Sequence, residues 1–361
     1  MAKAIRFGIA GLRRGADFLP ALAGREEAVL AAAFDPDPAR VEAVREALGE
    51  ARVCESYEEM LGSGIDAVIV ATPMHLHVPQ SVEALGRGIH VLSEVSAAVS
   101  LDQCRELVSA VRASSAKYMM AENCCYMRPF VVVREMVRAG VFGEVYYAEA
   151  DYVSESRGWR RPGGWTDRWI FGRRGGAYIT HPLGTALSWL DDRVVTVSCV
   201  GTGAHVEPSG TGDDRSVMLC ATSKGGLVQI RHDVVSPRPS TANYAALQGT
   251  KGAYEAPQSY GGTHRVYLVE PGGDPRNKEW RPLSEFEEQY LPAGYRQTAG
   301  GGVYGEADYH VVGAFVDSVL NDTEPPIDVY RALDFTVPGL LSEESAQLGG
   351  APVAVPDFRQ V

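Results

Sequence analysis

The chain has 361 residues, which fits two domains and is too long for one ordinary hydrophobic core. Its 45% hydrophobic and 22% charged residues are typical of a globular protein and exclude a disordered or fibrous chain. The net charge of −12 disfavours a nucleic-acid partner, because an acidic surface repels phosphate backbones. Six cysteines are too few for a disulfide scaffold, so we expect reduced thiols.

The sequence gives no sign of a membrane partner. The N-terminal stretch MAKAIRFGIAGLRRG has only a short apolar run, broken by glycines and followed by arginines, which does not suit a secretory signal. No other stretch approaches the roughly 20 apolar residues of a membrane span. We therefore expect a soluble, cytoplasmic protein.

The first third of the chain alternates short apolar runs with helical patterns. The runs that predict strands cover residues 4–10, 29–34, 67–71 and 89–92. The patterns that predict helices cover residues 16–23, 39–48, 80–86 and 101–114. Nearly continuous apolar strands separated by helices indicate a parallel sheet covered on both faces. We predict an N-terminal, doubly wound Rossmann domain over residues 1–123, in a protein of the α/β class.

The second part of the chain has a different pattern. Strand-like runs, several of them alternating in polarity, cover residues 145–152, 194–200, 216–221 and 227–234. Loops are predicted at residues 201–212, 271–282 and 292–305, and a helix at 308–320. Residues 124–361 are therefore expected to form an α+β domain with an open, mostly antiparallel sheet.

A glycine-containing turn follows the first predicted strand and precedes a helix, which is the setting in which dinucleotides bind. The glycine pattern is imperfect, because Arg13 holds the second glycine position and Ala16 the third. A plain strand-to-helix turn explains the segment about equally well. On the cofactor interpretation, the contacts come from Gly11, Leu12, Arg13 and Arg14.

Asp35 strengthens the cofactor interpretation. It ends the second predicted strand, about 20 residues after the turn, where a carboxylate accepts hydrogen bonds from the adenosine ribose and repels a 2′-phosphate. NAD is therefore favoured over NADP. The alternative is an aspartate that starts the turn Asp-Pro-Asp-Pro.

The segment from Ala71 to His77 follows the third strand, at the carboxyl edge of the sheet where open α/β folds place ligands. His75 and His77 are spaced as two metal ligands can be, but no third ligand lies at recognisable spacing. No metal is expected, and helix capping and packing explain these histidines better.

Thr72-Pro73 with His77, and the string from Gly88 to Glu94, resemble the Gfo/Idh/MocA family of nicotinamide oxidoreductases. The resemblance implies a Rossmann domain joined to a domain whose open sheet often mediates oligomerisation, so a homodimer or homotetramer is expected. It also implies that Thr72, Pro73, His77 and Glu94 contact NAD, although a strand-end surface charge also explains Glu94. Most members follow the glutamate with Lys-Pro, whose lysine transfers a proton, whereas Val95 and Ser96 stand here.

A narrower resemblance is to the NAD-dependent glycosidase branch typified by α-N-acetylgalactosaminidases. It is carried by the strings at residues 94–95, 122–126, 136–144, 178–181, 232–239, 249–252 and 355–358. The branch oxidises C3 of the sugar, and the resulting ketone acidifies H2 so that elimination and addition exchange the aglycone for water. Two positions depart from the branch, since Ser96 replaces a proline and Tyr304 stands where a second histidine is expected.

The branch places its functional histidine and tyrosine at His181 and Tyr178, so we predict His181 as the base and Tyr178 as an orienting or proton-relaying group. A helix-capping histidine and a packed tyrosine are the alternatives. Asn123, at the domain junction, is a predicted cofactor contact. The predicted substrate contacts are Tyr126, His232, Arg238 and Tyr304. Asp308 lies at the start of the predicted helix 308–320, and a role at the start of that helix explains this residue.

The sequence therefore predicts an NAD-dependent oxidoreductase that acts on a secondary hydroxyl, with C3 favoured, of a sugar or glycoside. A redox-neutral, NAD-dependent glycosidase is the first alternative. A non-catalytic NAD-binding sensor is the second, because the usual lysine is missing.

Overall fold

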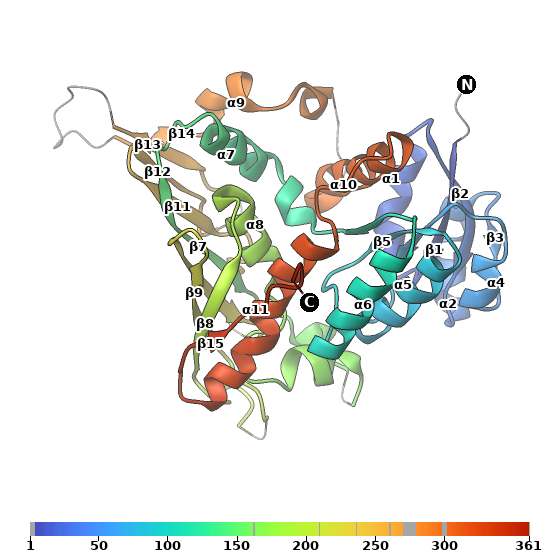
Figure 1. The fold of residues 1–361 in the computed structure, drawn as a ribbon, viewed down its shortest axis with the longest axis horizontal. Helices are drawn as coiled ribbons and strands as arrows, with labels where there is room; N and C mark the ends of the chain where they lie inside the picture. The colour runs from blue at the N-terminus through green and yellow to red at the C-terminus, as the bar shows by residue number, and fades with distance from the viewer. Residues whose placement is uncertain are drawn as a thin grey trace. The chain divides into compact units, whose positions relative to one another are not determined.

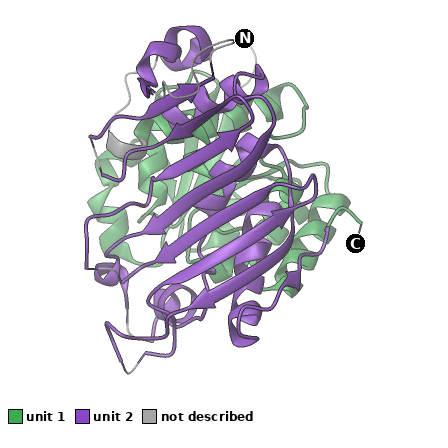
Figure 2. Cartoon of the chain, turned by 90° about the vertical axis from the view of Figure 1, so that its left-hand side faces the viewer, with its two compact units in different colours: residues 1–126, 299–333, 358–361 green, residues 127–298, 334–357 purple. Residues whose placement is uncertain are grey.

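A computed structural model describes residues 4–161, 163–208, 210–235, 237–259, 261–269, 279–297 and 302–360. The chain forms two compact units (Figure 2). The first contains residues 1–126, 299–333 and 358–361, and the second contains residues 127–298 and 334–357. From the sequence we predict two consecutive domains that divide at residue 123. In the structure, two later segments, 299–333 and 358–361, belong to the first unit as well.

The first unit contains a six-stranded sheet in the order β3-β2-β1-β4-β5-β6, and all its strand pairs are parallel (Figure 1). This is the doubly wound Rossmann order, and the predicted fold of this region is confirmed. The strands are β1 (Ile5–Ala10), β2 (Ala28–Phe34), β3 (Arg52–Val53), β4 (Ala67–Val70), β5 (His90–Ser93) and β6 (Tyr118–Met120). The prediction missed β3 and β6, which are too short to show a periodic pattern.

Helices cover this sheet, and α5 (His77–Gly86) packs beside α6 (Leu101–Ala113). The predicted helix 39–48 is divided at Val44 into α2 (Pro38–Ala43) and α3 (Arg45–Leu48). Side chains cap several helices, as when Ser100 accepts a hydrogen bond from the Gln103 amide at 3.2 Å before α6. The remaining helices of the unit are α1 (Leu19–Ala23), α4 (Tyr57–Leu61) and α10 (Gly302–Leu320).

Helix α10 belongs to the first unit because of the residues that it buries. Phe315 is fully buried, and its ring lies 6.1 Å from that of Phe7 on β1. Arg25 stacks over the Tyr309 ring at 3.9 Å and donates to the Tyr309 carbonyl at 2.7 Å. Helices α1 and α10 therefore lie side by side (Figure 1). The helix begins at Gly302, inside the loop that was predicted for residues 292–305.

The second unit contains a nine-stranded sheet in the order β14-β13-β12-β11-β7-β10-β9-β8-β15. Of the strand pairs that this second sheet forms among the described residues, only β7–β10 is parallel, so the predicted open, mostly antiparallel sheet is confirmed. The strands are β7 (Val145–Val153), β8 (Val194–Gly201), β9 (Ser216–Thr222), β10 (Leu227–Asp233), β11 (Ala245–Gly249), β12 (Gly252–Glu255), β13 (Arg265–Leu268), β14 (Arg281–Pro282) and β15 (Val353–Ala354).

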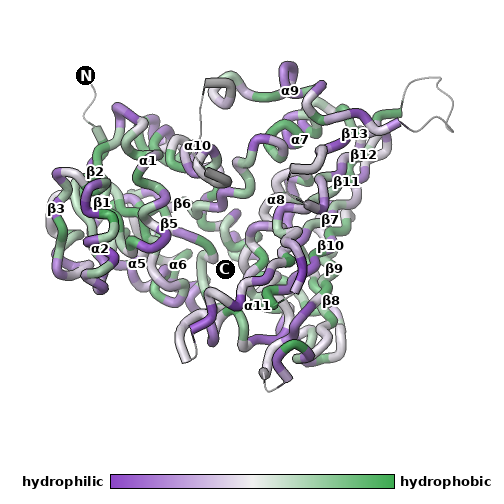
Figure 3. The backbone as a smooth tube through the Cα atoms, turned by 180° about the vertical axis from the view of Figure 1, so that it is seen from behind, coloured by the Kyte–Doolittle hydropathy of each residue, from purple (hydrophilic) through white to green (hydrophobic). Residues whose placement is uncertain are grey.

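One face of this sheet is covered and the other is open. On β9, Met218 and Cys220 are fully buried, whereas the alternating Val217 and Leu219 are 37% and 45% exposed. Figure 3 shows the mixture of hydrophobic and hydrophilic residues along these strands. The covering helices are α7 (Arg128–Arg138), α8 (Thr180–Leu190), α9 (Ser284–Tyr290) and α11 (Val329–Gln347).

Trp189 of α8 anchors the covered side. Its ring meets those of Phe130 at 5.6 Å and Tyr254 at 5.5 Å, and its indole donates to the Phe130 carbonyl at 3.1 Å. Of the predicted loop 271–282, residues 271–278 lie outside the described residues. Within the described chain, the helices are too short or too polar to cross a membrane.

Candidate active site

The turn after β1 has room only for glycine at position 11. Gly11 has a φ of +86°, and a Cβ there would lie 2.5 Å from the Ala71 carbonyl oxygen and 2.8 Å from the Thr72 amide nitrogen. Both neighbours are backbone atoms of the segment after β4, so they cannot turn aside as a side chain can. The close approach brings together two segments at the carboxyl edge of the sheet.

Asp35 is tied to the same turn. Its Oδ2 accepts a hydrogen bond from the Leu12 amide at 2.7 Å, and its Oδ1 accepts one from the Asp37 amide at 2.9 Å. The side chain of Leu12 is buried, whereas Asp35 is half-buried. Each carboxylate oxygen can accept a further hydrogen bond, so Asp35 can still bind a ribose hydroxyl. The glycine turn and the nearby carboxylate fit the adenosine half of a dinucleotide.

The two arginines of the turn differ in their surroundings. Arg13 is exposed. Arg14 donates to Asp308 through both terminal nitrogens at 2.8 Å, to Glu94 through Nε at 2.8 Å and to Asp17 at 3.0 Å. Burial alone would lower the pKa of Arg14, but the charges of Glu94, Asp308 and Asp17 more than offset it and raise that pKa.

Thr72, Pro73 and His77 lie in the segment that follows β4. The Thr72 hydroxyl donates to Gln80 at 2.6 Å. The ring nitrogens of the buried His77 face the Ser96 carbonyl at 2.9 Å and the Thr72 carbonyl at 2.8 Å. Burial lowers the pKa of His77, and a neutral imidazole donates to only one of the two carbonyls. His77 thus joins the loops after β4 and β5 and holds Thr72 at the sheet edge.

Glu94 and Asn123 meet the same network from other elements. Glu94 follows β5 and is 8% exposed; its Oε1 accepts from Arg14, and its Oε2 accepts from the Val95 amide at 3.0 Å. Asn123 is buried and donates to Asp308 at 3.3 Å, and its Oδ1 has no hydrogen-bond partner among the residues that the structure describes. Tyr126 is buried at the end of the same short helical turn, Asn123–Tyr126.

In the second unit, Tyr178 and His181 form a hydrogen-bonded pair at the start of α8. The Tyr178 hydroxyl lies 3.2 Å from His181 Nε2, and both side chains are half-buried. Beneath them lies Tyr152 of β7, which is 7% exposed and stacks on the His181 ring at 5.6 Å. The Tyr178 ring meets Tyr152 edge-on at 5.2 Å. An imidazole supported in this way can remove a proton near neutral pH.

Two glycines place this pair. The Gly175 amide donates to Asp213 at 2.8 Å, and the Gly176 amide donates to the Ser342 hydroxyl at 2.9 Å. Gly175 has a φ of +70°, and a Cβ there would lie 2.6 Å from the Ser342 oxygen. The turn is therefore fixed from both sides just before Tyr178. Sequence reasoning missed Asp213 and Ser342, because both are distant along the chain and neither lies in a recognisable motif.

His232 also contacts the ring of Tyr152. It is 4% exposed, and its ring stacks on that of Tyr152, with 6.1 Å between the ring centroids. Burial lowers the pKa of His232 to about 4, and its Nε2 has no hydrogen-bond partner within the described chain. Tyr152 could not be singled out from the sequence, because it is one more residue of an alternating strand. The structure brings His232 together with Tyr178 and His181 through this tyrosine.

All four predicted substrate contacts stay predictions, and the remaining two are Arg238 and Tyr304. Arg238 is exposed, and its Nε donates to the Pro239 carbonyl at 3.3 Å. The side chain of Tyr304 lies outside what the structure describes, although its backbone belongs to α10.

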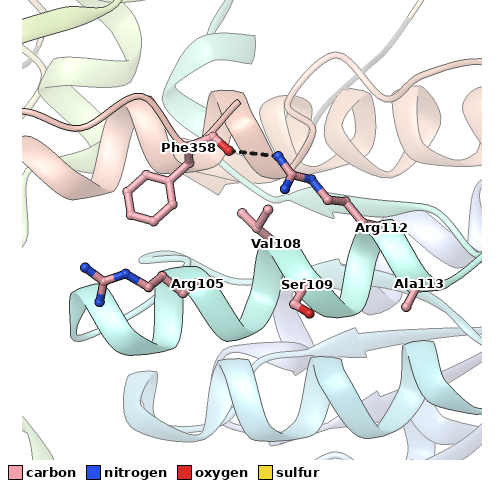
Figure 4. A pocket seen from close by; sticks show the side chains of 6 residues that line it. All are labelled: Arg105, Val108, Ser109, Arg112, Ala113 and Phe358. Atoms are coloured by element: carbon pink, nitrogen blue, oxygen red, sulfur yellow. Dashed lines mark hydrogen bonds between the residues drawn. The ribbon is translucent and has the colours of Figure 1, made fainter. Parts of the chain in front are cut away.

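A cavity of about 420 Å³ in the first unit is lined by none of the predicted site residues (Figure 4). It lies along α6 under the C-terminal segment, where Arg112 donates to the Phe358 carbonyl at 3.1 Å. Phe358 is 4% exposed, so the cavity marks where the end of the chain docks on α6.

Three family models match the chain. The NAD-binding Rossmann domain of the GFO/IDH/MocA oxidoreductase family matches residues 5–122, and a GFO/IDH/MocA C-terminal domain matches residues 130–255. The C-terminal domain of glycosyl hydrolase 109 matches residues 210–361.

Among curated proteins, a glycosyl hydrolase family 109 protein of Solibacter usitatus is 31% identical over 81% of this chain and 71% of its own length. The chain belongs to glycosyl hydrolase family 109, within the GFO/IDH/MocA oxidoreductases. A family 109 protein of Streptomyces filamentosus is 32% identical over 84% of this chain, but the match spans only 65% of that protein. The crystal structure of an oxidoreductase domain protein from Kribbella flavida superposes with a TM-score of 0.83 at 19% identity, over 98% of this chain and all of that one, and so shares the fold.

Family membership confirms the predicted resemblance and the predicted cofactor, NAD. The glycine turn at Gly11, which leaves no space for a Cβ, and the carboxylate of Asp35 at the end of β2 fit that cofactor. The protein is thus an NAD-dependent enzyme of a family that acts on sugars.

Proposed function

We propose that the protein oxidises a secondary hydroxyl, with C3 favoured, of a sugar or glycoside, and that His181 is the base. The observation that carries the proposal is the Tyr178–His181 pair, with 3.2 Å between the hydroxyl oxygen and Nε2. The oxidation of an alcohol requires a base, since the hydroxyl must lose its proton as hydride leaves its carbon, and the tyrosine beside this base can orient the hydroxyl or relay the proton. When bound, NAD supplies the hydride acceptor.

The residues divide the remaining tasks. The imidazole of His181 takes the hydroxyl proton, either directly or through the Tyr178 oxygen, and Tyr152 keeps the imidazole in place by stacking. Asp35, Thr72 and Glu94 serve the cofactor. Val95 is 5% exposed, and its side chain cannot transfer a proton, so another residue must do what the lysine is expected to do in most members of the broader family. The absence of this lysine supports His181 as the base.

Redox-neutral glycoside cleavage is the second candidate, and membership of family 109 favours it. Cleavage needs, beyond the oxidation, a base at H2 and an acid for the leaving group. Tyr304 stands where the branch is expected to carry its second histidine, and a phenol with a pKa of about 10 is a poor base at neutral pH. We therefore rank net oxidation first.

One experiment separates the candidates. The enzyme is mixed with NAD and a panel of nitrophenyl glycosides, and the absorbances of NADH and nitrophenol are followed in the same cuvette. NADH that grows in proportion to oxidised sugar supports the proposal. Nitrophenol release without NADH accumulation would put the glycosidase first, and neither signal on any sugar would favour the non-catalytic sensor.

We also propose that the enzyme works as a homo-oligomer joined through the open face of the second sheet. Its exposed apolar side chains are Val200, Val217, Leu219 and Leu227. Adjacent apolar residues on one sheet face are typical of an interface. Light scattering after gel filtration tests this, with Leu219→Glu expected to yield monomers; a wild-type monomer at micromolar concentration would refute it.

A further inference from the structure

Asp308 lies on α10, about 290 residues after the nucleotide turn, yet its carboxylate binds a residue of that turn. The residue is 1% exposed, and its two oxygens each accept a hydrogen bond from Arg14 at 2.8 Å. A third hydrogen bond comes from Asn123 Nδ2 at 3.3 Å. Within the described chain, both side chains that donate to this carboxylate, Arg14 and Asn123, are predicted cofactor contacts.

The pairing fixes the orientation of Arg14. A guanidinium is planar, so a carboxylate that occupies its NH1–NH2 edge also decides where Nε points. In this structure Nε points at Glu94 Oε1, 2.8 Å away. With that edge filled by Asp308 and Nε engaged by Glu94, Arg14 has no bidentate edge to offer a phosphate.

We propose that Asp308 is a positioning residue of the NAD site, which acts through Arg14 on Glu94. The same geometry leaves the exposed Arg13, rather than Arg14, to reach a phosphate. The inference rests on NAD binding, which family membership supplies, and not on the reaction proposed above. The proposal assigns α10 a role in cofactor binding that no motif in its sequence indicates.

The carboxylate charge is essential to this arrangement. An amide at position 308 keeps one acceptor oxygen but turns an NH2 group toward the guanidinium, so half of the bidentate contact becomes repulsive. Arg14 can then move toward the exposed Asp17, and Glu94 loses its side-chain donor from Arg14. The adenosine end of the site, held by Asp35 and the Leu12 amide, does not depend on this contact.

The test measures cofactor binding by calorimetry, with no sugar present. For Asp308→Asn we expect the Kd for NAD to rise about tenfold or more, as when one partner of a buried charge pair is removed. The Kd for AMP, which lacks the nicotinamide half, should stay within about twofold. Asp317→Asn is the matched control, because Asp317 lies exposed on the same helix; it should change neither affinity.

A double-mutant cycle tests the route through Arg14. If Asp308 acts through Arg14, Arg14→Lys should weaken NAD binding, and adding Asp308→Asn should weaken it no further. Independent, multiplying effects would overturn the proposal. So would an equal loss of AMP and NAD affinity, or a lower melting temperature with unchanged NAD affinity in the folded protein. Should Asp308→Asn not fold, unchanged NAD binding in Arg14→Lys alone overturns it.

Discussion

Gly11→Ala tests the nucleotide turn by adding a single methyl group. The substitution forces an L-residue into a left-handed conformation, since Gly11 has a φ of +86°. It also places a carbon 2.5 Å from the Ala71 carbonyl oxygen, well inside van der Waals contact. Two costs therefore add, one from the backbone dihedral and one from the clash.

A second glycine separates those costs. Gly88 has a φ of +73° in the same unit, and a Cβ there would meet nothing within 4 Å. Gly88→Ala should cost only the left-handed conformation, about 1–2 kcal/mol. Gly11→Ala adds overpacking against backbone, about 1–3 kcal/mol more.

The assay is thermal unfolding followed by NAD titration of the folded protein. At about 2–4 °C per kcal/mol for a unit of this size, Gly88→Ala should lower the melting temperature by about 2–8 °C. Gly11→Ala should lower the melting temperature further. It should also weaken NAD binding, because the displaced turn carries the Leu12 amide, which donates a hydrogen bond to Asp35. Equal melting temperatures and equal NAD affinities for the two variants would refute the steric argument.

Three further predictions concern the cofactor, the base and pH. NAD should bind at least tenfold (about 1.4 kcal/mol) tighter than NADP, and Asp35→Ser should reduce this difference in affinity. Equal affinities of the wild-type protein in a titration would contradict the ribose-binding role of Asp35. His181→Gln should abolish turnover. Tyr178→Phe should lower kcat, by about 10²–10⁴-fold if the proton transfer is lost. A full rate in either variant would show that the substituted residue has no catalytic role. Because burial holds the pKa of His232 at about 4, only the unfolded chain takes up this proton as pH falls below about 6.5. Between pH 7 and pH 4.5 the free energy of unfolding should fall by about 2 kcal/mol, and by less in His232→Gln.

The repetitive parts of the fold were predictable from the sequence. Buried parallel strands such as β4, AVIV, show their nature in an unbroken apolar run. Two-residue strands such as β3 carry no periodicity, so only their neighbour's hydrogen bonds define them. Helix α10 was predicted from residue 308 because the glycines before it read as a loop, whereas burial of Phe315 beside Phe7 assigns the helix to the first unit.

The site residues show a similar limit. Gly11 and Asp35 could be proposed as cofactor contacts from the sequence because a local motif and a fixed spacing indicate them. Tyr152, Asp213 and Ser342 were missed because each acts through a contact that only folding creates. A short motif reports what touches a ligand, whereas the residues that hold those groups can come from any part of the chain.

If His181 is the base, as proposed, cofactor binding and proton transfer are carried by separate segments of the chain. The resemblance to the broader oxidoreductase family implies a lysine directly after this glutamate in most members, so that one loop would perform both tasks. Here the Val95 amide donates a hydrogen bond to Glu94, which leaves that loop to serve the cofactor, and the proposed base, His181, follows a turn fixed by Asp213 and Ser342. Gly11→Ala should therefore weaken NAD binding, whereas His181→Gln should keep NAD binding and lose turnover. Titration and rate measurements on both variants test this, and a loss of NAD affinity in folded His181→Gln would show that the two tasks are not separate.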